Sequence, residues 1–141
     1  ICFFGDLTRL SPQLQQLAQQ TQAASSDYQI QANICLNYGG RDEIVRAARA
    51  FAVDCAAGKT VPEQLNEQIF SDYLYSAQIP DPDLVIRPSG EIRISNFLLW
   101  QSAYAEYYFT DVLWPDFDAA ELERAIASFN GRSRRYGGVK A

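Results

Sequence analysis

The sequence predicts an α/β fold in which a parallel sheet is flanked by helices. Apolar or alternating segments that are typical of strands alternate along the chain with segments whose apolar residues recur at helical spacing. The chain has 141 residues, a length that fits one domain, and 48% of them are hydrophobic, which is enough for an ordinary core. We therefore expect a single domain over residues 1–141.

The first predicted strand and helix come from short local signals. Residues 1–4 form an apolar run that ends at Gly5, as a strand entered partway would, which predicts a truncated or processed N-terminus. Ser11 followed by Pro12 is a helix-start signal, with Ser as the N-cap and Pro in the first turn. The leucines that follow among glutamines predict an amphipathic surface helix.

A second strand and helix are predicted next. Apolar residues alternate with polar ones over residues 28–36, which predicts a strand that ends in the turn at 37–40. Over residues 41–57 the apolar side chains fall on one helical stripe, and Gly58 is a normal C-terminal glycine. The order strand, loop, helix is that of an α/β unit.

The following pair is a helix and a buried strand. Thr60 with Glu63 resembles a capping box and predicts a helix to about Ser76. Residues 84–86 are wholly apolar, as in strands buried on both faces of a parallel sheet.

The last third of the chain predicts two more helices. Residues 96–109 are almost entirely apolar, which predicts a helix buried on most sides. Asp118 can cap a final helix, with Glu121 three residues on and Gly131 at its end. From Arg124 onward the chain has five cations and no acid.

Composition excludes several classes of function. The net charge of −5 argues against a general nucleic-acid binder. Because the chain has no histidine, Ser-His-Asp and Cys-His nucleophile systems are excluded within it. The three cysteines show no zinc-site spacing and are expected to be small buried hydrophobes. No stretch is long and apolar enough for a membrane span, so the chain reads as soluble and cytoplasmic.

The densest polar cluster spans residues 87–96, just after the predicted buried strand and before a predicted helix. In open α/β sheets this is the place of the ligand crevice. Arg87 and Arg93 supply two guanidinium forks, and Ser95 would stand at a helix N-terminus that favours an anion. The cluster predicts a diphosphate site. The alternative is that Arg87 pairs with Glu91 and that Ser95 only caps the helix.

Two further features allow two interpretations each. Glu106 is a carboxylate on the predicted apolar helix, where it needs either a metal ion such as Mg²⁺ or an Arg partner in the core. The turn 37–41 could present backbone N–H groups to an anion. The alternative is a plain turn in which Asp42 and Glu43 complement the helix dipole.

Residues 83–101 closely resemble the signature of cis-prenyltransferases, whose bacterial type is undecaprenyl diphosphate synthase. The similarity continues through residues 105–106 and 109–117 and the ending 134–138, and is also clear at 5–6 and 37–41. The resemblance spans nearly the whole chain. It implies a parallel sheet flanked by helices, a homodimer, and a Mg²⁺-dependent enzyme.

In that family, isopentenyl diphosphate is added to an allylic diphosphate, such as farnesyl diphosphate, to build a long-chain cis-polyprenyl diphosphate, for example the undecaprenyl carrier lipid. The lipid product implies a peripheral membrane association. The resemblance assigns diphosphate binding to Arg87, Arg93 and Ser95, and support of the loop to Glu91. It assigns the C-terminal Arg-x-Gly element to Arg135 and Gly137. Glu106 would serve the metal or its water shell.

The chain departs from the family pattern at several points. Pro88 stands where Thr is common and removes a backbone N–H, and Ile92 stands where some members have a polar residue. The family's catalytic Asp, in its N-terminal phosphate loop, lies outside this chain. We therefore expect residues 1–141 to be the C-terminal portion of a cis-prenyltransferase domain that is inactive alone.

Two alternatives stay open at this point. One is a noncatalytic partner subunit that lends its Arg-x-Gly tail to a catalytic chain, although the intact set of Arg87, Arg93 and Ser95 argues against it. The other is a generic phosphate-binding α/β module.

Overall fold

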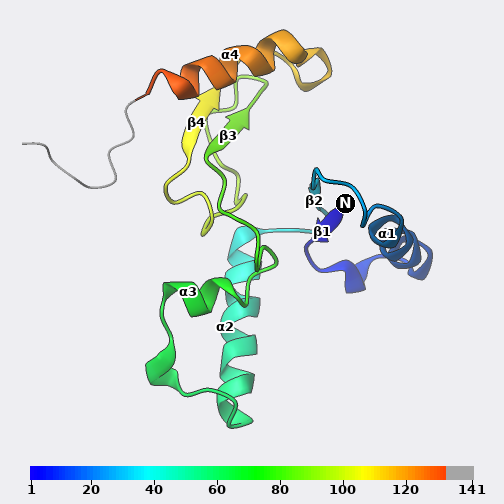
Figure 1. The fold of residues 1–141 in the computed structure, drawn as a ribbon, viewed down its shortest axis with the longest axis vertical. Coiled ribbons are helices and arrows are strands. Elements are labelled where there is room, and N and C mark those ends of the chain that lie inside the picture. The colour runs from blue at the N-terminus through cyan, green and yellow to red at the C-terminus, as the bar shows by residue number, and fades with distance from the viewer. Residues whose placement is uncertain (133–141) are drawn as a thin grey trace, which may run out of the picture. The chain divides into compact units, whose positions relative to one another are not determined.

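The computed structural model describes residues 1–132, which form two compact units, Ile1–Pro80 and the part that begins at Asp81 (Figure 1). The expected single domain over residues 1–141 stays a prediction. Among the described residues, no helix combines the length and the apolar composition that crossing a membrane requires.

The first unit is built on a parallel strand pair. β1 (Cys2–Phe4) pairs with β2 (Asn33–Cys35) in the register Cys2 to Asn33 and Phe4 to Cys35. The connection contains α1 (Pro12–Ala24), which contacts β1. Ser11 caps α1 by accepting a hydrogen bond from the Leu14 amide at 3.3 Å, so the predicted helix start is confirmed.

The strand expected over residues 28–36 is wrong for its first half, since only Asn33–Cys35 are paired. Tyr28 and Ile30 are 76% and 87% exposed. Their alternation with polar residues therefore marks no buried face. The physical reason is that β1 offers a partner of only three residues, so the segment before Asn33 has no ladder to join.

Two helices complete the first unit. α2 (Gly40–Ala56) is confirmed, and Gly58 follows it with a φ of +70°. The helix expected from Thr60 to about Ser76 is wrong: a 3₁₀ turn at Pro62–Gln64 is followed by α3 (Glu67–Ser71). The Thr60 hydroxyl donates to the Gln64 side chain, and Asn66 caps α3 instead. The buried apolar residues of this unit come from β1, both long helices and the segment after α3: Phe4, Ala18, Ala47, Phe51 and Leu74.

The second unit is a parallel strand pair with one helix. β3 (Leu84–Arg87) pairs with β4 (Glu106–Phe109), and α4 (Ala119–Asn130) contacts β4 (Figure 1). Asp118 caps α4 by accepting from the Glu121 amide at 2.9 Å, as the sequence predicts. The residues of β3 are half-buried, not fully buried as expected.

The buried helix expected over residues 96–109 is wrong. Ser95, Asn96 and Leu98 have φ values of 47°, 64° and 45°, which belong to the left-handed region and cannot continue a right-handed helix. Turns lead instead to β4, which takes its place beside β3. The apolar run therefore forms β4 and the turns that lead to it. The three cysteines are also half-buried, not buried as expected.

Candidate diphosphate site

A cavity of about 210 Å³ lies where β3 ends and the following loop returns. Arg87 closes β3 and Arg93 comes from the loop, and both residues line the cavity. The remaining lining comes from β3, the loop and β4 and is apolar or aromatic: Val85, Ile86, Pro88, Ile94, Phe97, Tyr107 and Phe109. The cavity therefore combines two arginines with an apolar and aromatic lining.

The loop backbone is held by the segment after β4. The Ser89 amide donates to the Val112 carbonyl at 2.8 Å, and the Gly90 amide donates to the Thr110 carbonyl at 2.9 Å. Ser89 and Gly90 have left-handed φ values of 68° and 67°. Because both amides already have acceptors, binding of an anion here depends on side chains.

The loop side chains pair differently from the sequence-based alternative. Arg87 donates from Nη2 to the Ser95 hydroxyl at 3.3 Å, whereas Glu91 forms an ion pair with Arg93. The expected Arg87–Glu91 pair is therefore wrong. Ser95 lies beside Arg87, but no helix begins there, so its expected place at a helix N-terminus is also wrong.

The ion pair between Glu91 and Arg93 is partly exposed, at 35% and 67% of the two side chains. Exposed pairs of this kind contribute only about 0–1 kcal/mol. A diphosphate can therefore replace the Glu91 carboxylate as the partner of Arg93 with little loss.

Glu106 lies on β4, not on a helix, and its Oε2 accepts from Arg132 Nη1 at 2.8 Å. The Arg partner is thus present, but the two side chains are 30% and 41% exposed and the pair is not in the core. In residues 1–132 no three His, Cys, Asp or Glu side chains group into a metal site. Mg²⁺ commonly takes one or two carboxylates plus substrate phosphates. Glu106 supplies one such carboxylate.

The side chains of β4 alternate between two surroundings. Tyr107 and Phe109 line the cavity, with their rings stacked at a centroid distance of 5.8 Å. Glu106 and Tyr108 instead contact residues of α4 or just beyond it. This follows from the period of two in a strand. Glu106 is therefore not among the cavity's lining residues.

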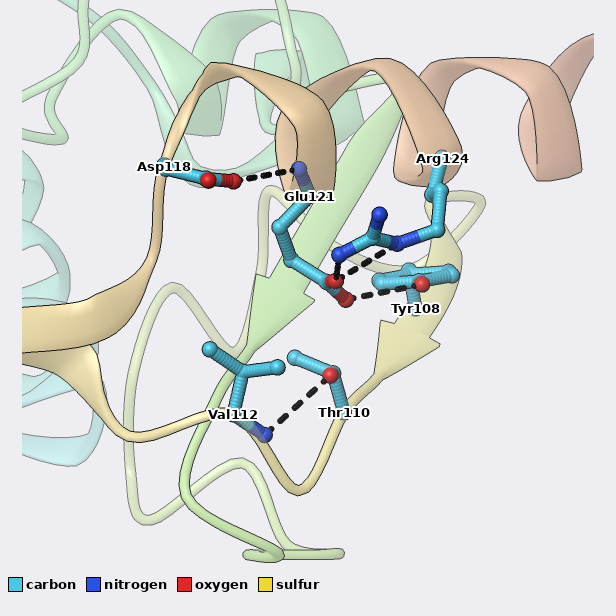
Figure 2. Close-up of polar contacts among 6 residues, drawn as sticks. All are labelled: Tyr108, Thr110, Val112, Asp118, Glu121 and Arg124. Carbon is cyan, nitrogen blue, oxygen red and sulfur yellow. Dashed lines mark hydrogen bonds and ion pairs between the residues drawn. The ribbon is translucent and has the colours of Figure 1, made fainter.

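A buried carboxylate holds α4 on β4 (Figure 2). Glu121 is 3% exposed and accepts hydrogen bonds from the Tyr108 hydroxyl at 2.9 Å and from Arg124 Nε at 2.7 Å. Hydrogen bonding by Thr110, and then by Arg124, lowers the pKa of Glu121. The sequence identified this residue only as part of a cap, because nothing local to α4 indicates its partners on β4.

The lowered pKa of Glu121 predicts an acid-sensitive contribution to stability. A carboxylate whose pKa is depressed in the folded state stabilises above the unfolded pKa, about 4.3, and this contribution is lost as pH falls through the folded value. Nearby Arg124 and Tyr108 do not titrate in this range. Glu121→Gln should therefore be less stable than the unchanged chain at pH 7, with a difference that shrinks below about pH 4. Urea unfolding at several pH values measures it.

The exposed Glu123 on the same helix provides the control for that titration. Glu123→Gln should leave the pH profile of the unchanged chain intact. A stability difference for Glu121→Gln that stays constant from pH 7 to pH 3 would contradict a role for the Glu121 charge.

The turn at 37–41 agrees with the plain-turn interpretation. Gly39 is the extended N-cap of α2, and both Asp42 and Glu43 lie in the first turn. Glu43 is fully buried and accepts from the Tyr38 hydroxyl at 2.5 Å and from the Tyr75 amide at 2.8 Å. The helix N-terminus is thus complemented by the chain's own acids.

Arg135 and Gly137, the remaining predicted site residues, lie outside the described residues. Of the other five, the structure brings Arg87, Arg93, Ser95 and Glu91 together in one loop, and Glu106 stands apart from the cavity. Sequence reasoning missed Thr110 and Glu121, whose contacts depend on the pairing of distant segments.

Two solved structures resemble the chain in fold. One is lavandulyl diphosphate synthase from Lavandula x intermedia in complex with dimethylallyl diphosphate, with a TM-score of 0.93, 38% identity, and coverage of 97% of this chain and 59% of that one. The other is a probable undecaprenyl diphosphate synthase from Campylobacter jejuni, with a TM-score of 0.82, 34% identity, and coverage of 96% and 62%. The predicted fold class is confirmed.

Curated relatives agree in sequence. The isoprenyl transferase of Heliobacterium mobile is 58% identical over 77% of this chain and 42% of its own length. That of Prochlorococcus marinus subsp. pastoris is 47% identical over 100% of this chain and 52% of its own. The chain thus spans about half the length of these relatives. The family model described as "Putative undecaprenyl diphosphate synthase" matches residues 1–137, and the chain therefore belongs to the undecaprenyl diphosphate synthase family.

Proposed function

We propose that the chain carries the isopentenyl diphosphate half-site of a cis-prenyltransferase. The complete reaction would condense isopentenyl diphosphate with an allylic diphosphate, such as farnesyl diphosphate, into a long-chain cis-polyprenyl diphosphate. The observation that supports this most is the cavity that Arg87 and Arg93 line together with apolar and aromatic residues. A ligand that fits has a doubly charged head and a short hydrocarbon tail.

Polar side chains of the loop bind the diphosphate head of the ligand. The forks of Arg87 and Arg93 bind phosphate oxygens, and Ser95, which accepts from Arg87, keeps its own hydroxyl proton to donate to the ligand. Glu91 holds Arg93 until the diphosphate arrives. Each charge-assisted hydrogen bond contributes about 1.5–3 kcal/mol, so two Arg and one Ser can hold a diphosphate with micromolar affinity.

We further propose that the complete enzyme depends on Mg²⁺ and that Glu106 serves this ion or its water shell. Glu106 lies outside the cavity lined by Arg87 and Arg93, so it would bind the ion apart from a diphosphate held there. The ion would supply positive charge to the departing diphosphate of the allylic substrate. The Arg132 guanidinium, which now pairs with Glu106, would give way or share that carboxylate.

Several parts of the proposal concern the complete enzyme. Arg135 and Gly137 would reach the diphosphate region across a homodimer interface. We also propose a cytoplasmic enzyme whose lipid product gives it a peripheral membrane association, and which does not act on nucleic acid. Because the 141 residues lack the family's phosphate-loop Asp, they should bind isopentenyl diphosphate weakly and form no polyprenyl product alone.

The test is calorimetric titration of isopentenyl diphosphate with Mg²⁺ into the 141-residue chain and into Arg87→Ala, after circular dichroism shows both to be folded. We expect at least a tenfold loss of affinity in Arg87→Ala, because one charge-assisted contact contributes about 1.5–3 kcal/mol. Arg49→Ala, at an exposed position on α2, is the matched control and should bind as the unchanged chain does.

The outcomes separate the alternatives. Binding that Arg87→Ala does not weaken would contradict the proposed site. Inorganic diphosphate that binds as tightly as isopentenyl diphosphate would favour a generic phosphate module, because the apolar wall would then contribute nothing. Absence of binding to the unchanged chain would favour the noncatalytic partner subunit.

A further inference from the structure

Thr110 connects both ends of the turn that carries Arg87. Immediately after β4, its backbone amide donates to the Arg87 carbonyl at 3.1 Å. Its own carbonyl accepts from the Gly90 amide at 2.9 Å. One residue on a neighbouring segment thus fixes the end of β3 and the far side of the turn.

The Thr110 hydroxyl holds together the segment that supports the turn. It accepts from the Val112 amide at 3.3 Å. Val112 in turn holds Ser89 through its carbonyl at 2.8 Å. Glu121 is fixed by Tyr108 and Arg124, as Figure 2 shows. The hydroxyl therefore ties residue 110 to residue 112, the two residues whose carbonyls hold the turn.

The turn needs such support because its backbone is unfavourable. Ser89 is not a glycine, yet it has a φ of 68°. L-residues adopt this region at a cost and keep it only where the surroundings hold them there. Without the contacts from residues 110 and 112, the turn would relax and the Arg87 guanidinium would leave the cavity.

We propose that Thr110 is a positioning residue for the diphosphate loop, acting through its hydroxyl on the Arg87–Gly90 turn. This inference rests on the proposed function, since it assigns Thr110 a part in the same site. Thr110 does not touch the ligand and is not among the residues that line the cavity.

The variant that isolates the hydroxyl is Thr110→Val, which retains the branched shape and both backbone hydrogen bonds. Thr110→Ser restores the hydroxyl, and Thr60→Val removes a hydroxyl hydrogen bond in the first unit as the matched control. Affinity for isopentenyl diphosphate with Mg²⁺ is measured by calorimetry under conditions where every variant is folded. We expect about a tenfold loss in Thr110→Val, recovery in Thr110→Ser, and no change in Thr60→Val.

Double variants separate positioning from general destabilisation. If Thr110 acts by placing Arg87, then Thr110→Val should weaken binding no further once Arg87→Ala is present. It should still weaken binding in an Arg93→Ala background. Losses that add fully with Arg87→Ala, or a Thr110→Val chain that binds as the unchanged chain does, would overturn the proposal.

Hydrogen exchange distinguishes failure of this inference from failure of the proposed function. Amides of Ser89 and Gly90 should exchange faster in Thr110→Val and regain protection in Thr110→Ser, whatever ligand the cavity takes. Unchanged exchange overturns the role of Thr110 in holding the turn. If the unchanged chain binds no isopentenyl diphosphate, the proposed function fails, and exchange still decides whether Thr110 holds the turn.

Discussion

Gly5→Ala should unfold the strand pair of the first unit. A Cβ at this position would lie 1.9 Å from the Leu36 carbonyl oxygen, and Gly5 has a φ of +125° that L side chains rarely adopt. Strained backbone and overpacking each cost about 1–3 kcal/mol, so we expect a loss of about 3 kcal/mol or more in unfolding free energy. The Asp6 amide, which donates to Asn37 at 3.3 Å, would be displaced with the strand.

Gly58→Ala is the matched control for that substitution. Gly58 also has a positive φ, +70°, but no atom lies within 4 Å of its Cβ position, so this variant measures the strain without the clash. Hydrogen exchange of peptides from residues 33–37 localises the effect, because both tryptophans, Trp100 and Trp114, belong to the second unit. Equal losses in the two glycine variants would show that the close approach to Leu36 is unimportant.

Glu43→Ala should have the second large effect, also on the first unit. The Glu43 side chain is fully buried and accepts from Tyr38 and from the Tyr75 amide. Removing the buried, charged carboxylate leaves the Tyr38 hydroxyl and the Tyr75 amide without this acceptor. Each charge-assisted hydrogen bond contributes about 1.5–3 kcal/mol. We expect a loss of about 3 kcal/mol, measured by urea unfolding followed by circular dichroism.

Two further variants show which property of Glu43 matters. Asp42→Ala removes an exposed acid from the same helical turn and should lower stability by less than about 1 kcal/mol, the contribution of a charge to the helix dipole. Glu43→Gln retains an oxygen that can accept from the Tyr75 amide and should recover part of the loss. A Glu43→Ala chain as stable as Asp42→Ala would contradict the structural role of Glu43.

The parts of the fold that depend on local hydrogen bonds were predictable from the sequence. Ser11 and Asp118 cap helices through hydrogen bonds within one turn, so the starts of α1 and α4 follow from sequence. The segment 96–109 failed because apolar composition does not distinguish a buried helix from the approach to a strand. What decides there is pairing with β3, a contact between distant segments that composition does not encode.

The candidate site was predictable in its ligand-facing groups and not in its support. Arg87 and Arg93 belong to one contiguous motif, and the structure brings both to one cavity. Glu121 joins α4 to β4 through side chains, and Thr110 joins the end of β4 to the loop after β3 through backbone atoms that every residue type possesses. The family resemblance assigns roles to the residues that face the ligand, and it assigns none to Glu121 and Thr110, which support them.

The alternation along β4 has a consequence for how such proteins diverge. Tyr107 and Phe109 shape the cavity, while Tyr108 between them helps to hold α4. Natural variation at the two outer positions can therefore alter ligand preference without weakening the attachment of the helix. Selection for a new substrate and selection for a stable protein act on neighbouring codons of the same strand, and each can proceed without opposing the other.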